Sequence, residues 1–375
     1  MSYTGDVRPL PPIVLERLAD GGRDLTVLVL RFGALGDLFR TLPPVRLIRA
    51  ALPRARLVWA VDDRWRVTIE GHPDLDEILA LPRIDRGERW AAVVDSMRRW
   101  RAGLRAVGAD LVLDFHGNLR SGVAGWLSSA PVRLGYAGHQ QKEGNRCFTT
   151  HRVEPGSHRA SRMERNLSMV RALGIACDPL PDSGLVFSDA SVERARGIVR
   201  ESVGVYCSYA VLSPGASLTQ AYKRPPVPLL AAAIEALAER GIATLVVYGP
   251  GEEADAGRVI EAAPRGSRLA PPTDLRVLAA LLRGARAFVG GDTGPLHLAC
   301  AVGCPVVGIY GPTDPAVNSP WGVPHRIVFP ARAAYTGVKK KDRRVGRFEE
   351  ISPEQVAEAV RELISESPLF LNAAH

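Results

Sequence analysis

A stretch in the last third of the chain combines the residue types that can bind a diphosphate. Gly290-Gly-Asp-Thr-Gly-Pro-Leu-His-Leu-Ala299 joins a predicted strand to a predicted helix. Glycines at such a turn let a ligand approach the backbone, and the free amides of the helix start attract negative charge. We expect Asp292 near the N-cap, with Thr293 and His297 four residues apart on one helical face. A well-capped helix with a packed histidine is the structural alternative.

An acidic residue near the N-terminus could act as a general base. Arg31-Phe-Gly-Ala-Leu-Gly-Asp37 lies between a predicted strand and a predicted helix. At the carboxyl end of a parallel strand, Asp37 would point into the crevice where α/β proteins bind ligands, and there it could accept a proton. A carboxylate in the first helical turn also stabilises a helix by about 0.3 to 1 kcal/mol, which is the structural alternative. The stretch has only two glycines, so the dinucleotide pattern G-x-G-x-x-G is incomplete.

Two further turns follow predicted strands in the second half of the chain. Ser213-Pro-Gly-Ala-Ser217 precedes Lys223, one of only five lysines, and a lysine can hold a phosphate oxygen as a mobile point charge. Tyr248-Gly-Pro-Gly-Glu-Glu253 could place Glu252 or Glu253 against ribose hydroxyls. A surface charge and an ordinary helix start remain alternative interpretations of these two turns.

Other catalytic frameworks are missing from the sequence. The serine-hydrolase, P-loop and zinc-protease patterns do not occur. Asp74-Leu-Asp76 matches the D-x-D pattern of metal-dependent sugar transfer, but it has no companion cluster of hard oxygen ligands, so we expect no metal site. His116, in Asp114-Phe-His-Gly-Asn118 at the end of a predicted strand, could line a cleft or lie at the edge of the core.

The elements that must position these residues form two α/β series. Apolar runs without alternation are typical of strands that are covered on both faces of a parallel sheet. Such strands are predicted at residues 26–30, 56–61, 110–114, 210–213, 243–248, 287–289 and 305–310. Helical patterns occupy residues 42–52, 192–203, 229–240, 274–282 and 294–302, and another starts near 252.

Two doubly wound, Rossmann-like domains are therefore expected, at residues 1–185 and 186–375. Prolines, a glycine and small polar residues at 178–184 indicate the connector between them. Residues 136–161 have little periodicity, and we expect them to form a mobile loop over a cleft. Ser352 and Gln355 have the spacing of a capping box that opens a terminal helix.

Composition narrows the class of protein. The 375 residues, 46% of them hydrophobic, are enough for two or three globular domains. A net charge of +8 suggests attraction to anions, but no RNA-binding signature or zinc finger occurs, so we expect no nucleic-acid partner. No apolar run reaches the roughly 20 residues of a membrane span, and no secretory signal is evident, which favours a cytoplasmic protein.

Taken together, the ordered blocks resemble glycosyltransferase family 9, the heptosyltransferases of lipopolysaccharide core assembly. The resemblance runs from about residue 25 to 328, and its most specific part is the block that ends at Ala299, followed by Gly311-Pro-Thr-Asp314. It implies two Rossmann-like domains that face one another across a cleft, the glycosyltransferase B arrangement. Transfer would be inverting and would need neither a metal nor a cofactor.

The resemblance also implies roles for individual residues. Asp37 would be the general base that takes the acceptor's hydroxyl proton, and Arg31 and His116 would bind the acceptor. In the other domain, Lys223 and the start of the helix near His297 would hold the diphosphate of a nucleotide-sugar. The expected nucleotide-sugar is ADP-heptose. The implied donor-binding residues are Ser213, Lys223, Glu252, Glu253, Asp292, Thr293, Gly294 and His297.

Several alternatives stay open at this level. The donor could be another nucleotide-sugar and the acceptor a glycan outside lipopolysaccharide, because the motifs concern the diphosphate and ribose. Arg224-Pro225-Pro226 after Lys223 departs from the Arg-Trp-Pro of many family members. A nucleotide-binding protein without transferase activity and an NAD(P)-dependent oxidoreductase are the competing classes. The acceptor would be lipid-linked or an oligosaccharide, and the basic surface would favour a peripheral contact with the anionic inner face of the cytoplasmic membrane.

Overall fold

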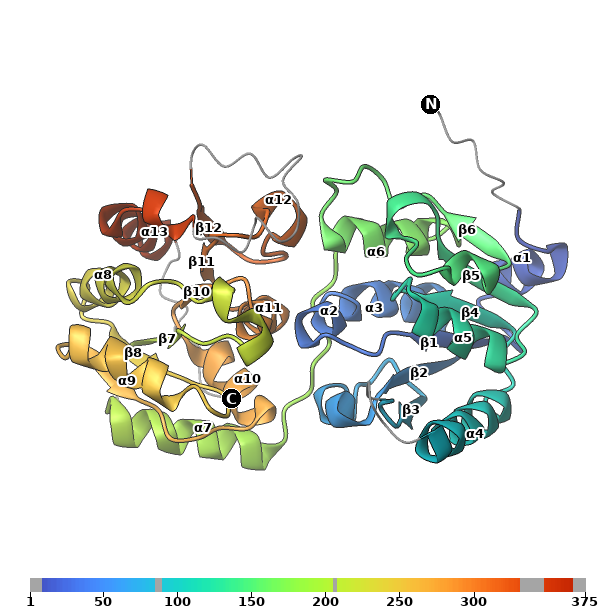
Figure 1. The fold of residues 1–375 in the computed structure, drawn as a ribbon, viewed down its shortest axis with the longest axis horizontal. Coiled ribbons are helices and arrows are strands. Elements are labelled where there is room, and N and C mark those ends of the chain that lie inside the picture. The colour runs from blue at the N-terminus through green and yellow to red at the C-terminus, as the bar shows by residue number, and fades with distance from the viewer. Residues whose placement is uncertain (1–8, 85–89, 205–207, 331–346, 367–375) are drawn as a thin grey trace. The chain divides into compact units, whose positions relative to one another are not determined.

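The chain forms two compact α/β units. The computed structural model describes residues 9–84, 90–204, 208–330 and 347–366. One unit is Met1–Val186 and the other Phe187–His375, so the division lies one residue after the predicted boundary. Each unit is built on one six-stranded sheet in which every neighbouring pair of strands is parallel (Figure 1).

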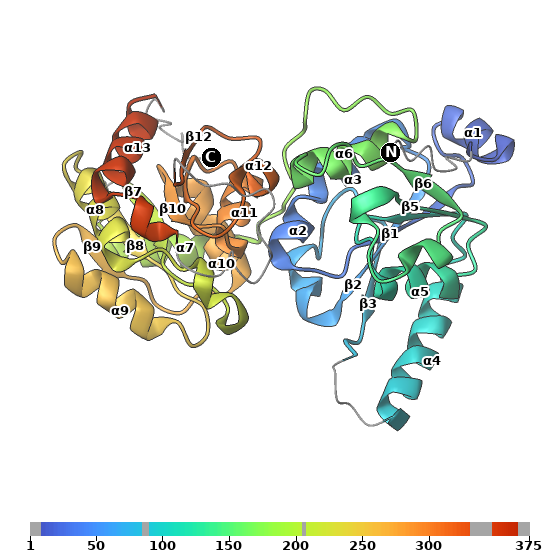
Figure 2. The same ribbon diagram turned by 45° about the horizontal axis from the view of Figure 1, so that its top comes forward.

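In the first unit the strand order is β3-β2-β1-β4-β5-β6. The strands are β1 (Thr26–Leu30), β2 (Arg56–Asp62), β3 (Glu77–Leu81), β4 (Leu111–Asp114), β5 (Val132–Tyr136) and β6 (His151–Val153). The helices are α1 (Pro12–Ala19), α2 (Leu35–Phe39), α3 (Leu42–Ala51), α4 (Trp90–Ala106), α5 (Leu119–Leu127) and α6 (Arg162–Arg171). Helices α3 and α6 pack together on one face of the sheet, and α4 and α5 pack on the other (Figures 1 and 2).

The second unit repeats this plan with the order β12-β11-β10-β7-β8-β9. Its strands are β7 (Tyr209–Ser213), β8 (Ala243–Val246), β9 (Ser267–Leu269), β10 (Phe288–Gly291), β11 (Val306–Ile309) and β12 (His325–Val328). Its helices are α7 (Asp189–Ser202), α8 (Val227–Ala238), α9 (Glu253–Ala262), α10 (Leu275–Gly284), α11 (Gly294–Ala301), α12 (Pro315–Asn318) and α13 (Pro353–Glu366). Helix α13 packs on α8, and α7 packs on α10 (Figure 1).

Burial explains why the apolar runs form the central strands. Residues 27–30 of β1 and 57–61 of β2 are fully buried, as expected for strands with helices on both faces. The predicted capping box at the start of α13 is present. Gln355 N donates to Ser352 Oγ at 3.2 Å, and Ser352 N donates to Gln355 Oε1 at 2.8 Å. The seven predicted strands correspond to β1, β2, β4, β7, β8, β10 and β11, whereas β3, β5, β6, β9 and β12 were not predicted.

Both sheets reverse their strand order at one point, between β1 and β4 and between β7 and β10. In an open α/β sheet, the loops after the strands separate at this point and leave a crevice at the carboxyl ends. Asp37 follows β1 and His116 follows β4, whereas Ser213 ends β7 and Asp292 follows β10. The predicted site residues therefore gather at the two positions where such folds bind ligands.

One predicted segment has more structure than expected. Residues 136–161, expected as a mobile loop, contain the edge strand β6, which pairs with β5 so that Leu134 lies opposite His151. The fully buried Asn145 anchors the intervening turn, and its Nδ2 donates to Asp114 Oδ2 at 2.8 Å. The prediction was wrong because a three-residue edge strand is too short to produce a periodic pattern.

Among the residues that the structure describes, no helix combines the length and the apolar character that crossing a membrane requires.

Candidate active site

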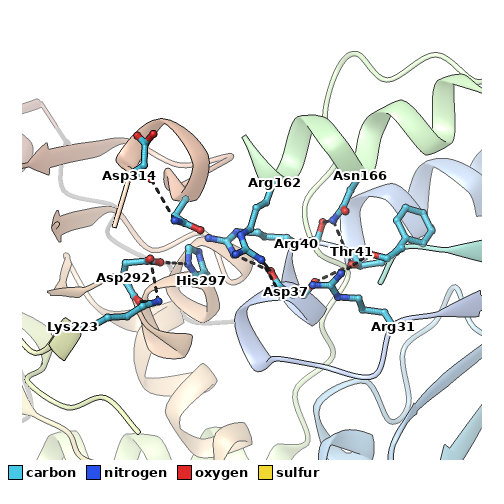
Figure 3. Close-up of polar contacts among 12 residues, drawn as sticks. Arg31, Asp37, Arg40, Thr41, Arg162, Asn166, Lys223, Asp292, His297 and Asp314 are labelled. Carbon is cyan, nitrogen blue, oxygen red and sulfur yellow. Dashed lines mark hydrogen bonds and ion pairs between the residues drawn. The ribbon is translucent and has the colours of Figure 1, made fainter. Parts of the chain in front are cut away.

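Asp37 lies at the switch point of the first sheet, in the first turn of α2, with 15% of its side chain exposed. Arg162 Nη1 donates to its two carboxylate oxygens at 3.0 and 3.1 Å, and Arg40 Nη1 donates to Oδ1 at 3.2 Å (Figure 3). Arg31 forms a third ion pair with the same carboxylate. Three guanidiniums therefore surround one carboxylate.

Separate parts of the first unit supply these arginines. Arg31 follows β1 and donates to the carbonyl of Phe115 after β4, so it bridges the two strands at the switch point. Arg40 is the C-cap of α2, and its carbonyl accepts a hydrogen bond from Asn166 Nδ2 of α6 at 2.9 Å. Arg162 is the first residue of α6. The packing of α6 against α2 and α3 thus completes the surroundings of Asp37.

These charges decide how basic Asp37 is. Burial is the largest single influence and by itself would raise the pKa of the carboxyl group. The charges of Arg162, Arg31 and Arg40 together outweigh burial and hold the pKa well below its usual value of 3.8. Asp37 is therefore ionised at neutral pH but is a weak base while all three arginines contact it.

His116 lies beside this group at the end of β4. Its backbone N donates to Asp114 Oδ1 at 2.9 Å, and its ring centre lies 5.7 Å from that of Phe32. Burial, followed by the charge of Arg31, lowers the pKa of His116 to about 3, so the ring is neutral at neutral pH. The structure thus places both predicted acceptor residues, Arg31 and His116, next to the candidate base.

Three buried nitrogens in this region have unused hydrogen-bonding capacity. Arg31 Nε, His116 Nδ1 and Trp65 Nε1 have no hydrogen-bond partner within the described part of the chain. Trp65 follows β2 and lies over Gly33, where an added Cβ would be 3.0 Å from Nε1. Because buried polar groups in folded proteins are nearly always paired, this group at the ends of β1, β2 and β4 is typical of a site completed by a polar ligand.

The neutral, buried ring of His116 gives a testable dependence of stability on pH. Its pKa falls from 6.5 to about 3 on folding, so between these values the unfolded chain binds a proton that the folded chain does not. Stability therefore rises with pH across this window. Between pH 7 and pH 4, His116→Gln should lose about 3 kcal/mol less stability than the wild type. Denaturant unfolding at both pH values measures this, with His325→Gln of β12 as the control, and equal losses in wild type and His116→Gln would contradict it.

Asp292 lies at the switch point of the second sheet, directly after β10. It directly precedes Thr293, the N-cap of α11, in agreement with its predicted place near the cap. The Thr293 side chain does not cap the helix, and its hydroxyl lies 3.4 Å from the carbonyl of Gly291. Gly294 is the first helical residue. The amides at the start of α11 therefore have no side-chain cap from Thr293.

A buried polar cluster surrounds Asp292. Lys223 Nζ donates to the Asp292 carbonyl at 3.0 Å and to its Oδ2 at 3.3 Å (Figure 3). His297 Nε2 donates to Asp292 Oδ1 at 3.1 Å. The structure therefore brings together Lys223, Asp292, Thr293 and His297, as predicted. It holds Lys223 and His297 on Asp292, a contact that the sequence did not reveal.

The glycines before this cluster have a packing role. A Cβ at Gly291 would lie 2.7 Å from the carbonyl of Lys223, and one at Gly290 would lie 2.9 Å from the carbonyl of Ser213. Close approach was expected between these glycines and a ligand. The structure shows close approach between β10 and the chain's own backbone, and this contact is what places Lys223 beside Asp292.

The two candidate ribose ligands differ in their surroundings. Glu252 Oε2 accepts a hydrogen bond from Gly249 N at 3.0 Å and lies over Gly215, where an added Cβ would be only 1.9 Å away. Glu253 is the exposed first residue of α9. Ser213, buried at the end of β7, begins the turn that contains Gly215. Of the two glutamates, Glu252 is thus the one whose carboxylate lies against the turn after β7, at the second switch point.

The D-x-D pair has structural partners. Asp74 forms an ion pair with Arg46 at 3.0 Å, and Asp76 pairs with Arg49 and accepts from Leu57 N at 2.7 Å. Within the described ranges, no group of three or more histidine, cysteine or acidic side chains could hold a metal ion. The carboxylates of this motif therefore form ion pairs with arginines and accept a hydrogen bond from a backbone amide.

Comparisons with known proteins identify the family. The sequence profile of glycosyltransferase family 9 (heptosyltransferase) matches residues 97–346, which include the whole second switch point. Lipopolysaccharide heptosyltransferase 1 of Pseudomonas aeruginosa is 26% identical over 304 residues, covering 80% of this chain and 82% of that protein. Asp37 and Arg31 precede the residues that the profile matches.

Solved structures share the fold. A family 9 glycosyltransferase from Veillonella parvula has a TM-score of 0.75 at 20% identity and covers 92% of this chain and 98% of its own. An Escherichia coli heptosyltransferase solved with ADP has a TM-score of 0.66 at 20% identity, with coverages of 90% and 100%. The family match replaces the oxidoreductase alternative. The chain belongs to glycosyltransferase family 9 and is a heptosyltransferase-like glycosyltransferase.

Proposed function

We propose that the protein transfers heptose from ADP-heptose to a lipopolysaccharide-core acceptor, with inversion and without a metal or cofactor. The observation that carries this proposal is the pair of switch-point clusters, a carboxylate among arginines in one unit and a lysine, aspartate and histidine at a helix start in the other. Support for the donor comes from the relatives, because one is a heptosyltransferase of lipopolysaccharide and a protein of similar fold was solved with ADP.

In the proposed reaction, Asp37 takes the proton from an acceptor hydroxyl. The freed oxygen attacks C1 of the heptose from the face opposite the diphosphate, so the configuration inverts. The bond from C1 to the phosphate oxygen breaks, and its electron pair leaves with ADP. Lys223 and the amides at the start of α11 stabilise the charge that develops on the leaving diphosphate. In this proposal Glu252 binds the ribose, and Asp292 positions Lys223 and contacts the donor sugar.

The deciding experiment measures nucleotide release. Purified protein with a lipopolysaccharide-core acceptor should release ADP from ADP-heptose, and release from UDP- and GDP-sugars should be much slower. Activity should persist in EDTA, and the NMR coupling across the new glycosidic bond should correspond to inversion at C1. Turnover only with another nucleotide-sugar would replace the donor, and nucleotide binding without any turnover would favour the non-catalytic alternative.

The outer face of α4 supports a peripheral contact of the protein with an anionic membrane, where a lipid-linked acceptor would lie. One stripe of this helix consists of side chains spaced three or four residues apart, namely Trp90, Val94, Arg98, Arg101 and Arg105. Trp90 is 79% exposed. The side chains of Arg98 and Arg101 have no hydrogen bond or ion pair to other described residues. An exposed tryptophan followed by arginines is typical of helices that lie at a lipid interface.

This contact predicts selective vesicle binding. The protein should cosediment with vesicles of phosphatidylglycerol and phosphatidylcholine but not with phosphatidylcholine alone. The double variant Arg98→Gln/Arg101→Gln should weaken binding about 30-fold, since each basic residue near such a surface is worth about 1 kcal/mol. The control is Arg194→Gln/Arg196→Gln, which removes the same charge from the exposed face of α7. Equal effects of both double variants would indicate non-specific attraction by net charge.

A further inference from the structure

The fold holds the three arginines around Asp37 with different firmness. The side chains of Arg31 and Arg40 are 10% and 5% exposed, and Arg31 also donates to the carbonyl of Phe115. The Arg162 side chain is 42% exposed, although it contacts both carboxylate oxygens of Asp37. The arginine that contacts Asp37 most fully is therefore the one that can turn away without opening the core.

Arg162 also has the strongest effect on the base. Among the charges that lower the pKa of Asp37, that of Arg162 is the largest. A carboxylate that is to accept a proton must first lose some of this stabilisation, because each contact with a guanidinium favours the ionised form. Departure of Arg162 alone would remove the largest single contribution to that effect and leave Arg31 and Arg40 in place to orient Asp37.

The surroundings of Asp37 also favour the binding of an anion in addition to the Asp37 carboxylate. Asp37 and its three arginine partners carry a formal net charge of +2, and His116 adds no negative charge. Arg31 Nε and His116 Nδ1 are buried beside Asp37 without a partner in the described chain. An anion at this point would gain charge-assisted hydrogen bonds, which are shorter and stronger than neutral ones.

We propose that Arg162 couples acceptor binding to the basicity of Asp37. The acceptor carries an anionic group, a phosphate or a carboxylate, near its reacting hydroxyl. This group draws the Arg162 guanidinium away from Asp37. The inference rests on the proposed role of Asp37 as the base. Arg162 is then a positioning residue that also determines acceptor specificity. Without such an acceptor, Asp37 stays a weak base, so a water molecule in its place is not activated and the donor is protected from hydrolysis.

A titration tests the coupling without any turnover. The carboxyl ¹³C resonance of Asp37 in the full-length protein, assigned by its loss in Asp37→Asn, reports the pKa of this group. Arg162→Gln should raise that pKa, and inorganic phosphate should raise it in the wild type but not in Arg162→Gln. The control is Arg171→Gln at the other end of α6, which pairs with Glu164 and should leave the titration unchanged. An unchanged titration in Arg162→Gln, or in wild type with phosphate, would overturn the coupling.

A kinetic comparison shows whether the anion must belong to the acceptor. Two acceptors are used, one with its phosphate or carboxylate and one with that group removed or esterified. Arg162→Gln should lose about 10- to 100-fold of the preference for the anionic acceptor in kcat/KM, the effect of losing a hydrogen bond to a charged group. Transfer to the neutral acceptor should persist, and hydrolysis of the donor by water should increase.

The outcomes separate this inference from the proposed function. A purely structural role of Arg162 would lower kcat/KM for both acceptors equally, with no change in preference, and would overturn the coupling. Arg162→Lys should retain part of the preference, because it keeps the charge but loses the two-pronged geometry. If wild-type protein transfers no sugar to either acceptor while the titration of Asp37 responds to Arg162 and to phosphate, the transferase assignment fails and the coupling within the site stands.

Discussion

Asp37→Asn should lower kcat for sugar transfer by about 10²- to 10⁴-fold, the contribution typical of a positioned general base. The amide has nearly the same shape as the carboxylate but cannot take the acceptor's proton. Affinity for ADP should stay within about twofold of wild type, because the residues that we assign to the donor belong to the other unit. Quenched-flow measurement of ADP release, together with calorimetry of ADP binding, separates the two effects.

The matched control for this variant is Asp20→Asn. Asp20 is also a carboxylate paired with arginines, Arg23 and Arg54, but it lies at the exposed end of α1. The Asp20→Asn variant should keep full activity. The thermal stability of both variants should be measured as well, because three guanidiniums around a neutral amide would destabilise the first unit of Asp37→Asn. Retention of wild-type kcat by a folded Asp37→Asn protein would remove Asp37 from the mechanism.

Asp292→Ala should destabilise the second unit by about 3 to 5 kcal/mol, the usual result of breaking a buried ion pair from one side. Asp292 is 4% exposed and accepts from both Lys223 and His297, so its loss leaves a poorly solvated ammonium and a buried imidazole without this partner. For a domain of this size the unfolding temperature should fall by roughly 6 to 20 °C. Calorimetry of the full-length protein measures the transition of this unit.

A double variant tests the reason for that loss. Asp292→Ala/Lys223→Met removes the unpaired ammonium as well, so it should be more stable than Asp292→Ala alone, with a coupling energy of about 1 to 3 kcal/mol. Asp274→Ala, which removes the N-cap of α10 in the same unit, is the control and should cost only about 1 kcal/mol. If the two single changes simply add, the ion pair between Lys223 and Asp292 does not hold the switch point together.

In the proposed reaction, the two clusters would divide the work of transfer according to charge. The acceptor would lose its proton in the arginine-rich site, and negative charge would develop on the leaving diphosphate next to a lysine and a helix start. In the structure, both cationic groups already contact a carboxylate, Arg162 that of Asp37 and Lys223 that of Asp292.

Local sequence was sufficient for the central strands and for placing the candidate site residues at the carboxyl ends of those strands. Buried parallel strands require continuous apolar runs, and a residue directly after such a run must lie at a carboxyl edge, which located Asp37, His116, Ser213 and Asp292. The capping box of α13 was equally predictable, because its two hydrogen bonds join residues three apart. Arg40 could have been found in the same way, as the residue three after Asp37.

The partners of these residues were decided by the tertiary structure. Arg162 is 125 positions from Asp37, and Lys223 is 69 positions from Asp292, so no local periodicity links either pair. Glu252 was separated from Glu253 only by its contact over Gly215, and β6 only by its pairing with β5. A sequence determines which face of an element is apolar and where that element ends. Which distant side chains then meet depends on strand order and on helix packing, and the pKa of Asp37 follows from those meetings.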